Sequence, residues 1–207
     1  ANYGHANSNW AFYEITAFAT INQRVYNLFN EVSLDHWINS NATHLRSLME
    51  DIKTFWLGIP TIERNGNIVN LETRKAVGLL AYLASSSPSP LSRENLATLL
   101  WPEYDQQHAN ANLRRSLYSI NRDLGPDFII SNRESLMIKP SCLFWQDTGE
   151  FRLLLAKVKS HNHEGIACEE CIGNLEKAYT LYRGSFLEGL NLRDSPEFDS
   201  WQYIQRE

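Results

Sequence analysis

The stretch from Leu71 to Pro140 constrains the fold most, because its hydrophobic pattern changes there from helical spacing to a hairpin. Three amphipathic helices are expected, at about 72–85, 92–101 and 105–124. Two short apolar runs follow, at 128–131 and 135–138, on either side of Asn132-Arg133-Glu134. The pattern therefore predicts a compact three-helix core that is followed by a hairpin with an exposed tip.

The third expected helix has one apolar stripe and a polar remainder. Asp105 is expected to cap its start and Gly125-Pro126 to end it. Its apolar residues follow spacings of four, four, three and four, and they are Ala109, Leu113, Leu117, Ile120 and Leu124. A helix that lies on a three-helix core with its polar side outward, and that is followed by a hairpin, is how winged-helix proteins enter a DNA groove.

A small antiparallel sheet is expected before the first helix. Segment 52–57 has the character of a strand, and the runs 62–64 and 68–71 flank Asn65-Gly66-Asn67. Asn-Gly between short apolar runs favours a hairpin because both residues tolerate positive φ. Ser92 is the expected N-cap of the helix at 92–101. Two further helices are expected at about 10–29 and 34–49.

After Pro140 the pattern predicts helices alone, at about 147–158 and 168–182 and from Pro196 onward, with Ser195 as a cap. On 168–182 one face collects Cys168, Cys171, Ile172, Leu175, Tyr179 and Tyr182. On the last helix the expected buried side begins with Phe198, Trp201 and Ile204. Paired amphipathic helices of this length indicate a tetratricopeptide-like stack, of which about one repeat is visible. The expected fold class is mainly α with small β-sheets.

Two ordered blocks carry a resemblance to a known family. The first consists of Arg74–Ala84, Ser92–Ala97, Leu99–Pro102 and Ala109–Leu117. The second consists of Leu175–Ala178, Leu181–Gly189 and Asp194–Trp201. In these blocks the chain resembles bacterial transcriptional activators of the antibiotic-regulatory-protein type, which join an OmpR/PhoB-like winged helix to a bacterial transcriptional activator domain. The resemblance spans about residues 52–207 and leaves 1–48 uncovered.

The resemblance implies a cytoplasmic, sequence-specific DNA-binding regulator that activates transcription. Helix 105–124 would enter the major groove, and the 128–138 wing would touch the minor groove or the backbone. Double-stranded DNA is the implied partner, with RNA polymerase and a second, head-to-tail copy of the chain beside it. The implied domains are a helical extension at 1–48 without an assigned role, a winged helix at 49–140, and a truncated helical activator domain at 141–207.

Candidate DNA contacts lie on the polar face of helix 105–124, namely Asn110, Arg114, Arg115, Tyr118, Asn121 and Arg122. Arginine reads guanine and asparagine reads adenine, and either residue can hold phosphate. Arg133 at the hairpin tip is a candidate for a narrow minor groove. Arg74, Lys75 and Arg93, which open the first two helices, could hold phosphate. Without the winged-helix context, ordinary solvated residues explain all of these positions.

The charge distribution keeps other functions open. The net charge of −5 argues against a nonspecific nucleic-acid binder. Residues 49–140 carry ten basic and ten acidic side chains, so that basic contacts must come from their placement. That neutrality also supports an alternative, a scaffold whose winged helix binds protein. Because the sequence begins without Met and ends inside an expected helix, the N-terminal output module of a larger ATPase or repeat regulator is a further alternative.

One motif has metal-ligand spacing. His161, His163, Cys168 and Cys171 form H-x-H-x₄-C-x₂-C, and four such ligands can hold zinc tetrahedrally. The cysteines also continue the apolar face of their helix, and a small buried hydrophobe needs no metal. Zinc is thus the cofactor that the sequence leaves open, and no other cofactor is expected.

Several function classes have no support in the sequence. Neither a nucleophile with a base beside it nor a phosphate-binding Gly-rich loop is recognisable, so we expect no enzyme. No apolar run approaches the ~20 residues of a membrane helix, and no segment resembles a signal peptide. Three cysteines, two of them three residues apart, favour a reducing cytoplasm over a disulfide framework.

Overall fold

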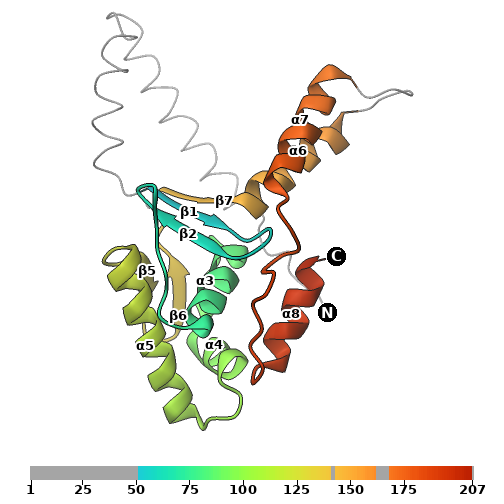
Figure 1. Ribbon diagram of the computed structural model, residues 1–207. Helices are drawn as coiled ribbons and strands as arrows, with labels where there is room; N and C mark the ends of the chain where they lie inside the picture. Colours follow the sequence, from blue (N-terminus) through green and yellow to red (C-terminus); the bar gives the residue numbers. More distant parts are fainter. Residues whose placement is uncertain (1–50, 141–142, 162–167, 207) are drawn as a thin grey trace, which may run out of the picture. The chain divides into compact units, whose positions relative to one another are not determined.

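The computed structural model describes residues 51–140, 143–161 and 168–206. Residues 49–207 form one compact unit, in which two small sheets accompany six described helices (Figure 1). The helices expected at 10–29 and 34–49 lie outside the described residues. More than half of the described residues are helical, which agrees with the mainly α class expected.

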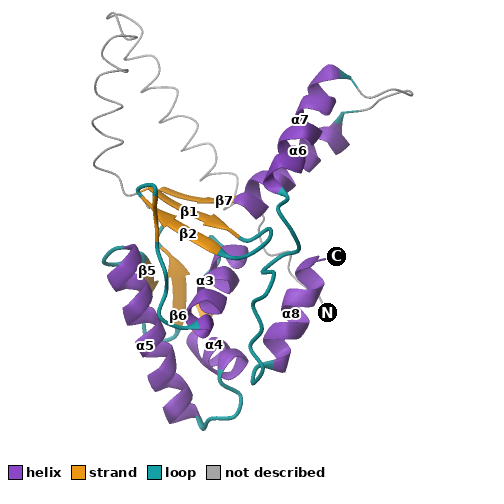
Figure 2. Ribbon diagram, in the orientation of Figure 1, coloured by secondary structure: helices purple, strands orange, loops and turns teal. Residues whose placement is uncertain are grey.

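The first sheet has the strand order β3-β2-β1-β7 (Figure 2). Strand β1 (Asp51–Phe55) pairs antiparallel with β2 (Thr61–Arg64), and β2 pairs with β3 (Asn67–Ile68). Asn65 and Gly66 make the turn with φ of 52° and 77°, as the Asn-Gly pair predicts. The small sheet expected before the first helix is therefore confirmed.

The other neighbour of β1 is β7 (Leu143–Gln146), which pairs with it in parallel. The expectation of helices alone after Pro140 is wrong for these residues. Phe144 packs on the core, while the next residue, Trp145, places its ring 5.3 Å from that of Phe55. Successive side chains thus use both faces of the sheet, which is strand geometry. Strand β7 forms because it pairs with the edge of β1, which is distant in the sequence. The local hydrophobic spacing of residues 143–146 therefore does not predict it.

Three helices follow the first sheet, α3 (Arg74–Ser86), α4 (Arg93–Leu100) and α5 (Gln106–Leu124). The side chains of Thr73, Ser92 and Asp105 cap them, each accepting a hydrogen bond from a backbone N–H three residues onward. Such caps satisfy N–H groups that have no partner inside the helix. The expected caps of α4 and α5 are confirmed, and Gly125 ends α5 with a φ of 119°.

The expected hairpin is also confirmed. Strands β5 (Ile129–Ser131) and β6 (Ser135–Ile138) pair antiparallel, and β4 (Leu91–Ser92) joins β6 on its other side. Leu136 and Ile138 point into the core, whereas the intervening Met137 is only half-buried. Because β4 leads directly into α4, this second sheet fixes the hairpin against the start of α4.

The C-terminal part has two components. Helices α6 (Asp147–Ser160) and α7 (Glu169–Leu181) run side by side as a hairpin, whereas α8 (Pro196–Arg206) packs on α4 (Figure 1). The segment between α7 and α8 enters the main core together with the start of α8, and its buried residues there are Phe186, Leu187, Leu190, Leu192 and Phe198. The described residues hold one helical pair, so the tetratricopeptide-like stack stays a prediction.

The C-terminal helices bury only part of their apolar residues, and the burial expected of Ile204 is wrong. On α7 the side chains of Ile172, Leu175, Tyr179 and Tyr182 are exposed, Tyr179 to 80%, while Cys171 and Ala178 are buried. The pairing of α6 with α7 buries one narrow stripe, and within the described ranges no third helix covers the rest of this face. On α8, Ile204 is 66% exposed although Phe198 is fully buried.

Two polar side chains bind distant elements together. Ser195 Oγ donates to the Leu100 carbonyl at 2.8 Å and so ties the start of α8 to the end of α4, in place of the capping bond expected of its side chain. The Asp147 carboxylate accepts from the N–H groups of Trp56 and Leu57 at 2.8 and 2.9 Å, which fixes α6 to the end of β1. Burial raises the pKa of Asp147, and these hydrogen bonds oppose the shift.

Candidate nucleic-acid interface

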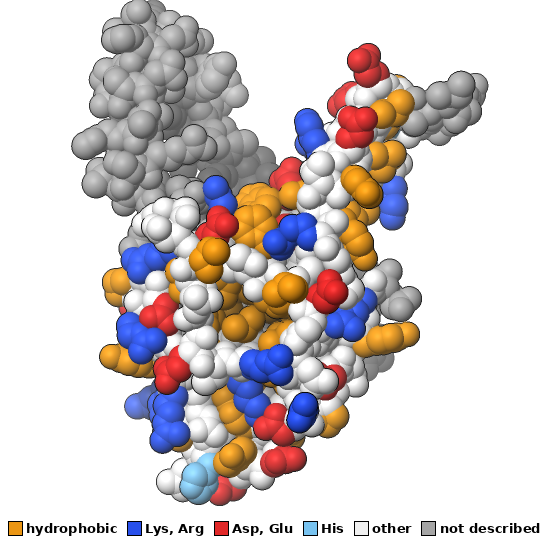
Figure 3. Space-filling model, in the orientation of Figure 1, with side chains coloured by type: hydrophobic (Ala, Val, Ile, Leu, Met, Phe, Trp, Pro, Cys, Tyr) orange, Lys and Arg blue, Asp and Glu red, His pale blue; other side chains and the backbone are white. Residues whose placement is uncertain are grey.

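Helix α5 presents a polar face opposite its buried stripe. Gln107, Ala111, Arg114 and Tyr118 follow spacings of four, three and four, which places them on one line along the helix. Tyr118 is 71% exposed, and Arg114 is also exposed. Basic side chains gather on the side of the molecule where α5 runs, with acidic ones between them (Figure 3). This face has the exposure and the residue types that groove readout requires.

The turn before α5 is held by a local charge. Asp105 accepts from the backbone N–H of His108 at 3.0 Å and lies 2.6 Å from His108 Nδ1. The backbone hydrogen bond, followed by the side-chain contact, lowers the pKa of Asp105. A carboxylate at a helix N-terminus is stabilised by the N–H groups that it meets there. The start of the candidate recognition helix is therefore fixed within its own sequence.

The hairpin tip is organised by one asparagine. Asn132 Oδ1 accepts from the N–H groups of Glu134 and Ser135 at 2.8 and 2.7 Å. Arg133 between them is exposed. The tip is also fastened to α4, because the Arg93 guanidinium donates to Ser131 Oγ and to the Asn132 carbonyl. Arg93 was expected to contact phosphate. In the structure its guanidinium instead holds the hairpin tip to the start of α4.

A hollow opens between the start of α4, helix α5 and the wing tip. Its lining consists of Ser92, Arg93, Glu94, Gln106, Asn110, Arg114, Arg133 and Glu134. Four residues singled out from the sequence meet here, namely Asn110 and the three arginines. Burial, followed by the nearby charge of Arg114, lowers the pKa of Arg93. Within the described ranges Arg114 and Arg133 make no hydrogen bond or ion pair, so their guanidinium groups are available to an anion.

Arg115 and Tyr118 lie elsewhere on the same helix. Arg115 donates to Asn112 Oδ1 at 3.3 Å and lines a second hollow, on the side of α5 away from the wing. Tyr118 lies one turn after Arg114 on the exposed face of α5, opposite the buried stripe. The structure therefore divides the expected pair, since Arg114 turns toward the wing and Arg115 turns away from it.

Asn121 and Arg122 have other partners than the sequence suggests. Asn121 donates to the Ile129 carbonyl at 3.3 Å and accepts from the Ile129 N–H at 2.8 Å, so both ends of its amide hold β5. Arg122 pairs with Asp123 at 2.7 Å and approaches Glu72 at 3.9 Å. The expected base-reading role is corrected for Asn121, because its amide is already used within the fold.

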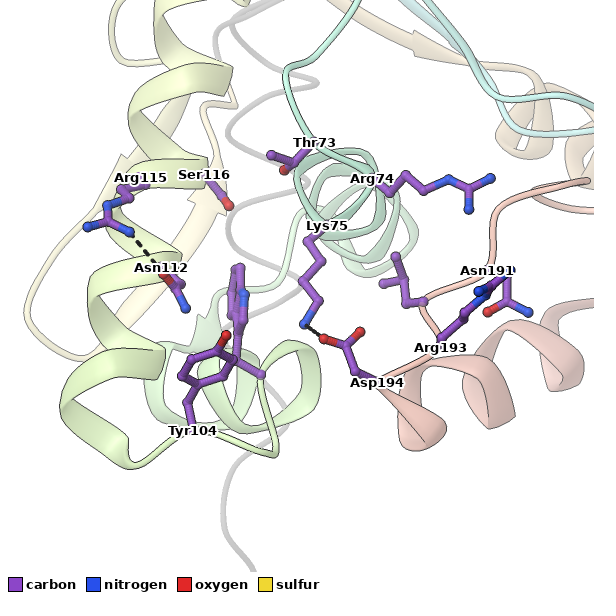
Figure 4. A pocket seen from close by; sticks show the side chains of 12 residues that line it. Thr73, Arg74, Lys75, Tyr104, Asn112, Arg115, Ser116, Asn191, Arg193 and Asp194 are labelled. Atoms are coloured by element: carbon purple, nitrogen blue, oxygen red, sulfur yellow. Dashed lines mark hydrogen bonds and ion pairs between the residues drawn. The ribbon is translucent and has the colours of Figure 1, made fainter.

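Arg74 and Lys75 face the C-terminal segment (Figure 4). Lys75 Nζ lies 2.7 Å from Asp194 Oδ2 and 5.3 Å from the centroid of the Trp101 ring. Arg74 donates to the Gly189 carbonyl at 3.0 Å. The hydrogen bond from Lys75 lowers the pKa of Asp194. The expectation that these two residues hold phosphate is corrected, because they fasten residues 189–194 to α3.

Sequence reasoning missed Gln107 on the outward face of α5. Its position is four before Ala111 and seven before Arg114, so the spacing that identified the apolar stripe could have found it on the opposite side. Gln107 is exposed, and its amide can bond to a base edge or to phosphate. The outward line therefore begins one turn earlier than expected.

The residues considered for zinc lie apart from this interface. His161 Nδ1 lies 3.3 Å from Cys171 Sγ and 3.4 Å from Cys168 Sγ, across the loop between α6 and α7. His163 lies outside the described residues. Burial raises the pKa of the Cys171 thiol, and the neighbouring Cys168 and Glu170 act in the same direction.

Comparison with known proteins gives a likeness of fold. No protein-family model matches the chain, and no curated protein matches it significantly. Among solved structures it is similar to EmbR of Mycobacterium tuberculosis in complex with a low-affinity phosphopeptide, with a TM-score of 0.58 and 18% identity over 75% of this chain. The match spans 41% of the EmbR chain. The likeness concerns the fold alone, and it extends over most of the described part.

Proposed function

We propose that this chain is a non-enzymatic, cytoplasmic regulator that binds specific DNA sites and activates transcription. In this proposal residues 49–140 bind DNA, and residues from 141 onward contact RNA polymerase or a second copy of the chain. The family resemblance of the sequence motivates the activator role, and the EmbR-like fold is consistent with it. The observation that carries the proposal is the placement of Arg114 and Arg133 around one hollow, without partners in the described residues.

The placement fits two kinds of contact with one duplex. Arg114 lies on the outward line of α5 with Gln107 and Tyr118, so a groove that accepts this helix would meet its guanidinium. Arg133 at the wing tip would reach the neighbouring backbone or the minor groove. Asn110 lies beside both arginines in the hollow. Base readout would come from α5 and anchoring from the wing, while Arg93 keeps the wing at the right distance from α4.

Selection of bound duplexes from a random library tests this proposal. Fluorescence anisotropy should then show binding of the selected duplex that weakens steeply with salt, because displaced counterions accompany each phosphate contact. The double variant Arg114→Ala/Arg133→Ala should raise the dissociation constant at least about tenfold. Failure to enrich any sequence, with no binding of a mixed duplex pool even at low salt, would contradict DNA binding.

One observation favours a second candidate function, a protein-interaction scaffold. The exposed Ile172, Leu175 and Tyr179 give α7 an apolar outer face, as expected of a surface that meets another protein. The two functions are separable in the same anisotropy experiment. A folded chain that binds no duplex at low salt supports the scaffold, and salt-sensitive binding of a selected duplex supports the regulator.

A further inference from the structure

The α6–α7 hairpin brings three metal-binding side chains together at the end where the chain passes from α6 to α7. His161 follows the last turn of α6, Cys168 precedes the first turn of α7, and Cys171 lies within that turn. Their ligand atoms, one imidazole nitrogen and two sulfurs, all lie within 4.8 Å of one another. These residues belong to neither the outward face of α5 nor the wing, so the group is distinct from the candidate DNA interface.

The distances suit a tetrahedral zinc ion. Zn–S bonds of ~2.3 Å and a Zn–N bond of ~2.0 Å at the tetrahedral angle would place nitrogen and sulfur roughly 3.5 Å apart. His161 Nδ1 lies 3.3 Å from Cys171 Sγ and 3.4 Å from Cys168 Sγ. Both short distances converge on the same ring nitrogen, which would direct the imidazole and the two thiolates at one point.

The alternative of a small buried hydrophobe explains only part of the group. Cys171 is 1% exposed and would be satisfied by burial alone. Cys168 is half-buried and His161 is exposed, so apolar packing gives no reason for their approach to Cys171. A disulfide between the two cysteines would leave the position of His161 unexplained. A metal ion accounts for all three side chains together.

The packing between α6 and α7 is weak enough that a metal ion would add stability to the hairpin. Apart from the junction with β1, its buried side chains are Leu154 on α6 and Cys171 and Ala178 on α7. None of the three belongs to the main core. Two helices with so little apolar contact gain little from packing, and small units of this kind are often held by a metal or a disulfide.

We propose that His161, Cys168 and Cys171 bind one Zn²⁺ ion, which fastens the connected end of the α6–α7 hairpin. Thiolate and imidazole ligands in tetrahedral arrangement favour zinc over magnesium or calcium. His163, the remaining member of the sequence motif, lies outside the described residues. The ion would fix the end of α6 against the start of α7 and thereby hold the exposed face of α7 in place. This inference is independent of DNA binding.

Elemental analysis of the full chain, purified under reducing conditions and dialysed without chelator, tests the site. About one zinc ion per chain is expected. After replacement by Co²⁺, the spectrum should show thiolate charge-transfer bands and the intense visible bands of tetrahedral cobalt. Hydrogen–deuterium exchange at the end of α6 and the start of α7 should slow when zinc is restored, whereas exchange in α5 should not change.

Matched variants locate the ligands. Cys168→Ser, Cys171→Ser and His161→Ala should each weaken zinc binding at least about tenfold, whereas Cys142→Ser and His108→Ala should retain it. The proposal is overturned if the wild-type chain holds less than about a tenth of an equivalent of zinc and gives no cobalt–thiolate bands. It is equally overturned if both cysteine variants bind zinc as the wild type does. The wild-type measurements decide the question even where a variant fails to fold.

Discussion

Three arginines on α5 have the same chemistry and different surroundings. Arg122 is paired with Asp123, Arg115 donates to Asn112, and Arg114 has no hydrogen-bonded partner among the described residues. A guanidinium that is already paired must give up a favourable contact before it can bind another anion, whereas an available one gains the whole new interaction. Arg114 is therefore the strongest candidate for a base contact, followed by Arg115.

We expect Arg114→Ala to reduce the free energy of binding to a selected duplex by about 1–3 kcal/mol, because a bidentate contact to guanine has that magnitude. The loss should also relax specificity at one position of the site. Fluorescence anisotropy with the selected duplex and with single-base variants of it measures both effects.

Arg152→Ala is the matched control for Arg114→Ala, because Arg152 is an exposed arginine on α6, bonded to Gln205 and far from the hollow in sequence. Its affinity for DNA should equal that of the wild type within about 0.5 kcal/mol. Equal affinities for all three proteins would remove Arg114 from the interface. A uniform loss across all duplexes would instead make Arg114 a phosphate contact.

The Lys75–Asp194 pair gives a pH-dependent prediction. The hydrogen bond from Lys75 holds the pKa of Asp194 below its usual 3.8, so the pair stabilises the fold at neutral pH and loses this effect as the pH falls through that range. Asp194→Asn should lower the free energy of unfolding by ~0.2–1 kcal/mol at pH 7, a small value because Asp194 is 41% exposed. Urea denaturation measures the difference.

The difference between wild type and Asp194→Asn should be complete above about pH 5 and should shrink as the pH falls below 3.8, because the carboxyl group then becomes protonated first in the unfolded and finally in the folded state. Glu176→Gln on α7 serves as the control, since Glu176 is an exposed carboxylate that lies outside the main core. A gap between wild type and Asp194→Asn that stays constant from pH 7 to pH 3 would show that the ion pair is not its source.

At the scale of the elements, local chemistry accounts for what the sequence could predict. Ser92 and Asp105 set the starts of α4 and α5, and Asn65-Gly66 sets the first hairpin, because each acts within three or four residues. The stripe of α5 needed only helical spacing. The arrangement of three helices and a hairpin from Leu71 to Pro140 therefore follows closely from its sequence.

Long-range contacts account for what the sequence could not predict. Strand β7 forms because β1, about ninety residues earlier, offers it an edge. Lys75 and Asn121 were expected at DNA because their types suit it, but their partners Asp194 and Ile129 are found only in the folded chain. Spacing gives the face on which a residue lies, and it does not give what that face meets.

Asn121 provides a test at the element scale, because its amide makes two hydrogen bonds to the backbone of β5. Asn121→Ala should lower the free energy of unfolding by about 1–3 kcal/mol, since it leaves a half-buried N–H and carbonyl without their partners. It should also weaken DNA binding through a displaced wing. Urea denaturation and anisotropy measure the two effects.

Asn112→Ala is the matched control for Asn121→Ala, because it makes the same change on the same helix and removes only the bond to Arg115. Both Asn→Ala changes raise helix propensity by the same small amount. The difference between their free energies of unfolding therefore measures the hydrogen bonds that Asn121 makes to β5. Equal stability of the two variants would mean that Asn121 does not anchor the wing and would return it to the set of candidate DNA contacts.

At the scale of the whole described unit, the C-terminal segment is part of the main core. Phe198 and Leu192 are buried against α3, and the Trp201 ring lies 4.6 Å from that of Tyr82. Gly78 on α3 permits this approach, because a Cβ there would lie 3.1 Å from both Leu192 Cδ1 and Phe198 Cζ. Residues 192–201 therefore pack directly on α3 and α4, which support the candidate interface.

Gly78→Ala should accordingly destabilise the protein by about 1–2 kcal/mol. The added methyl group meets two buried side chains that have little room to move, and this overpacking outweighs the gain of up to ~1 kcal/mol in helix propensity. Gly173→Ala on α7 makes the same change where a Cβ meets nothing within 4 Å, so its melting temperature should be equal to or above that of the wild type. Thermal unfolding followed by tryptophan fluorescence gives the melting temperatures, and Trp201, 5.1 Å from Phe198, is one of the six tryptophans that contribute to the signal. If both variants raise the melting temperature, helix propensity controls the outcome and the close approach of residues 192–198 to α3 has no energetic weight; a lower value for Gly78→Ala alone would show that this contact between the C-terminal segment and α3 stabilises the fold.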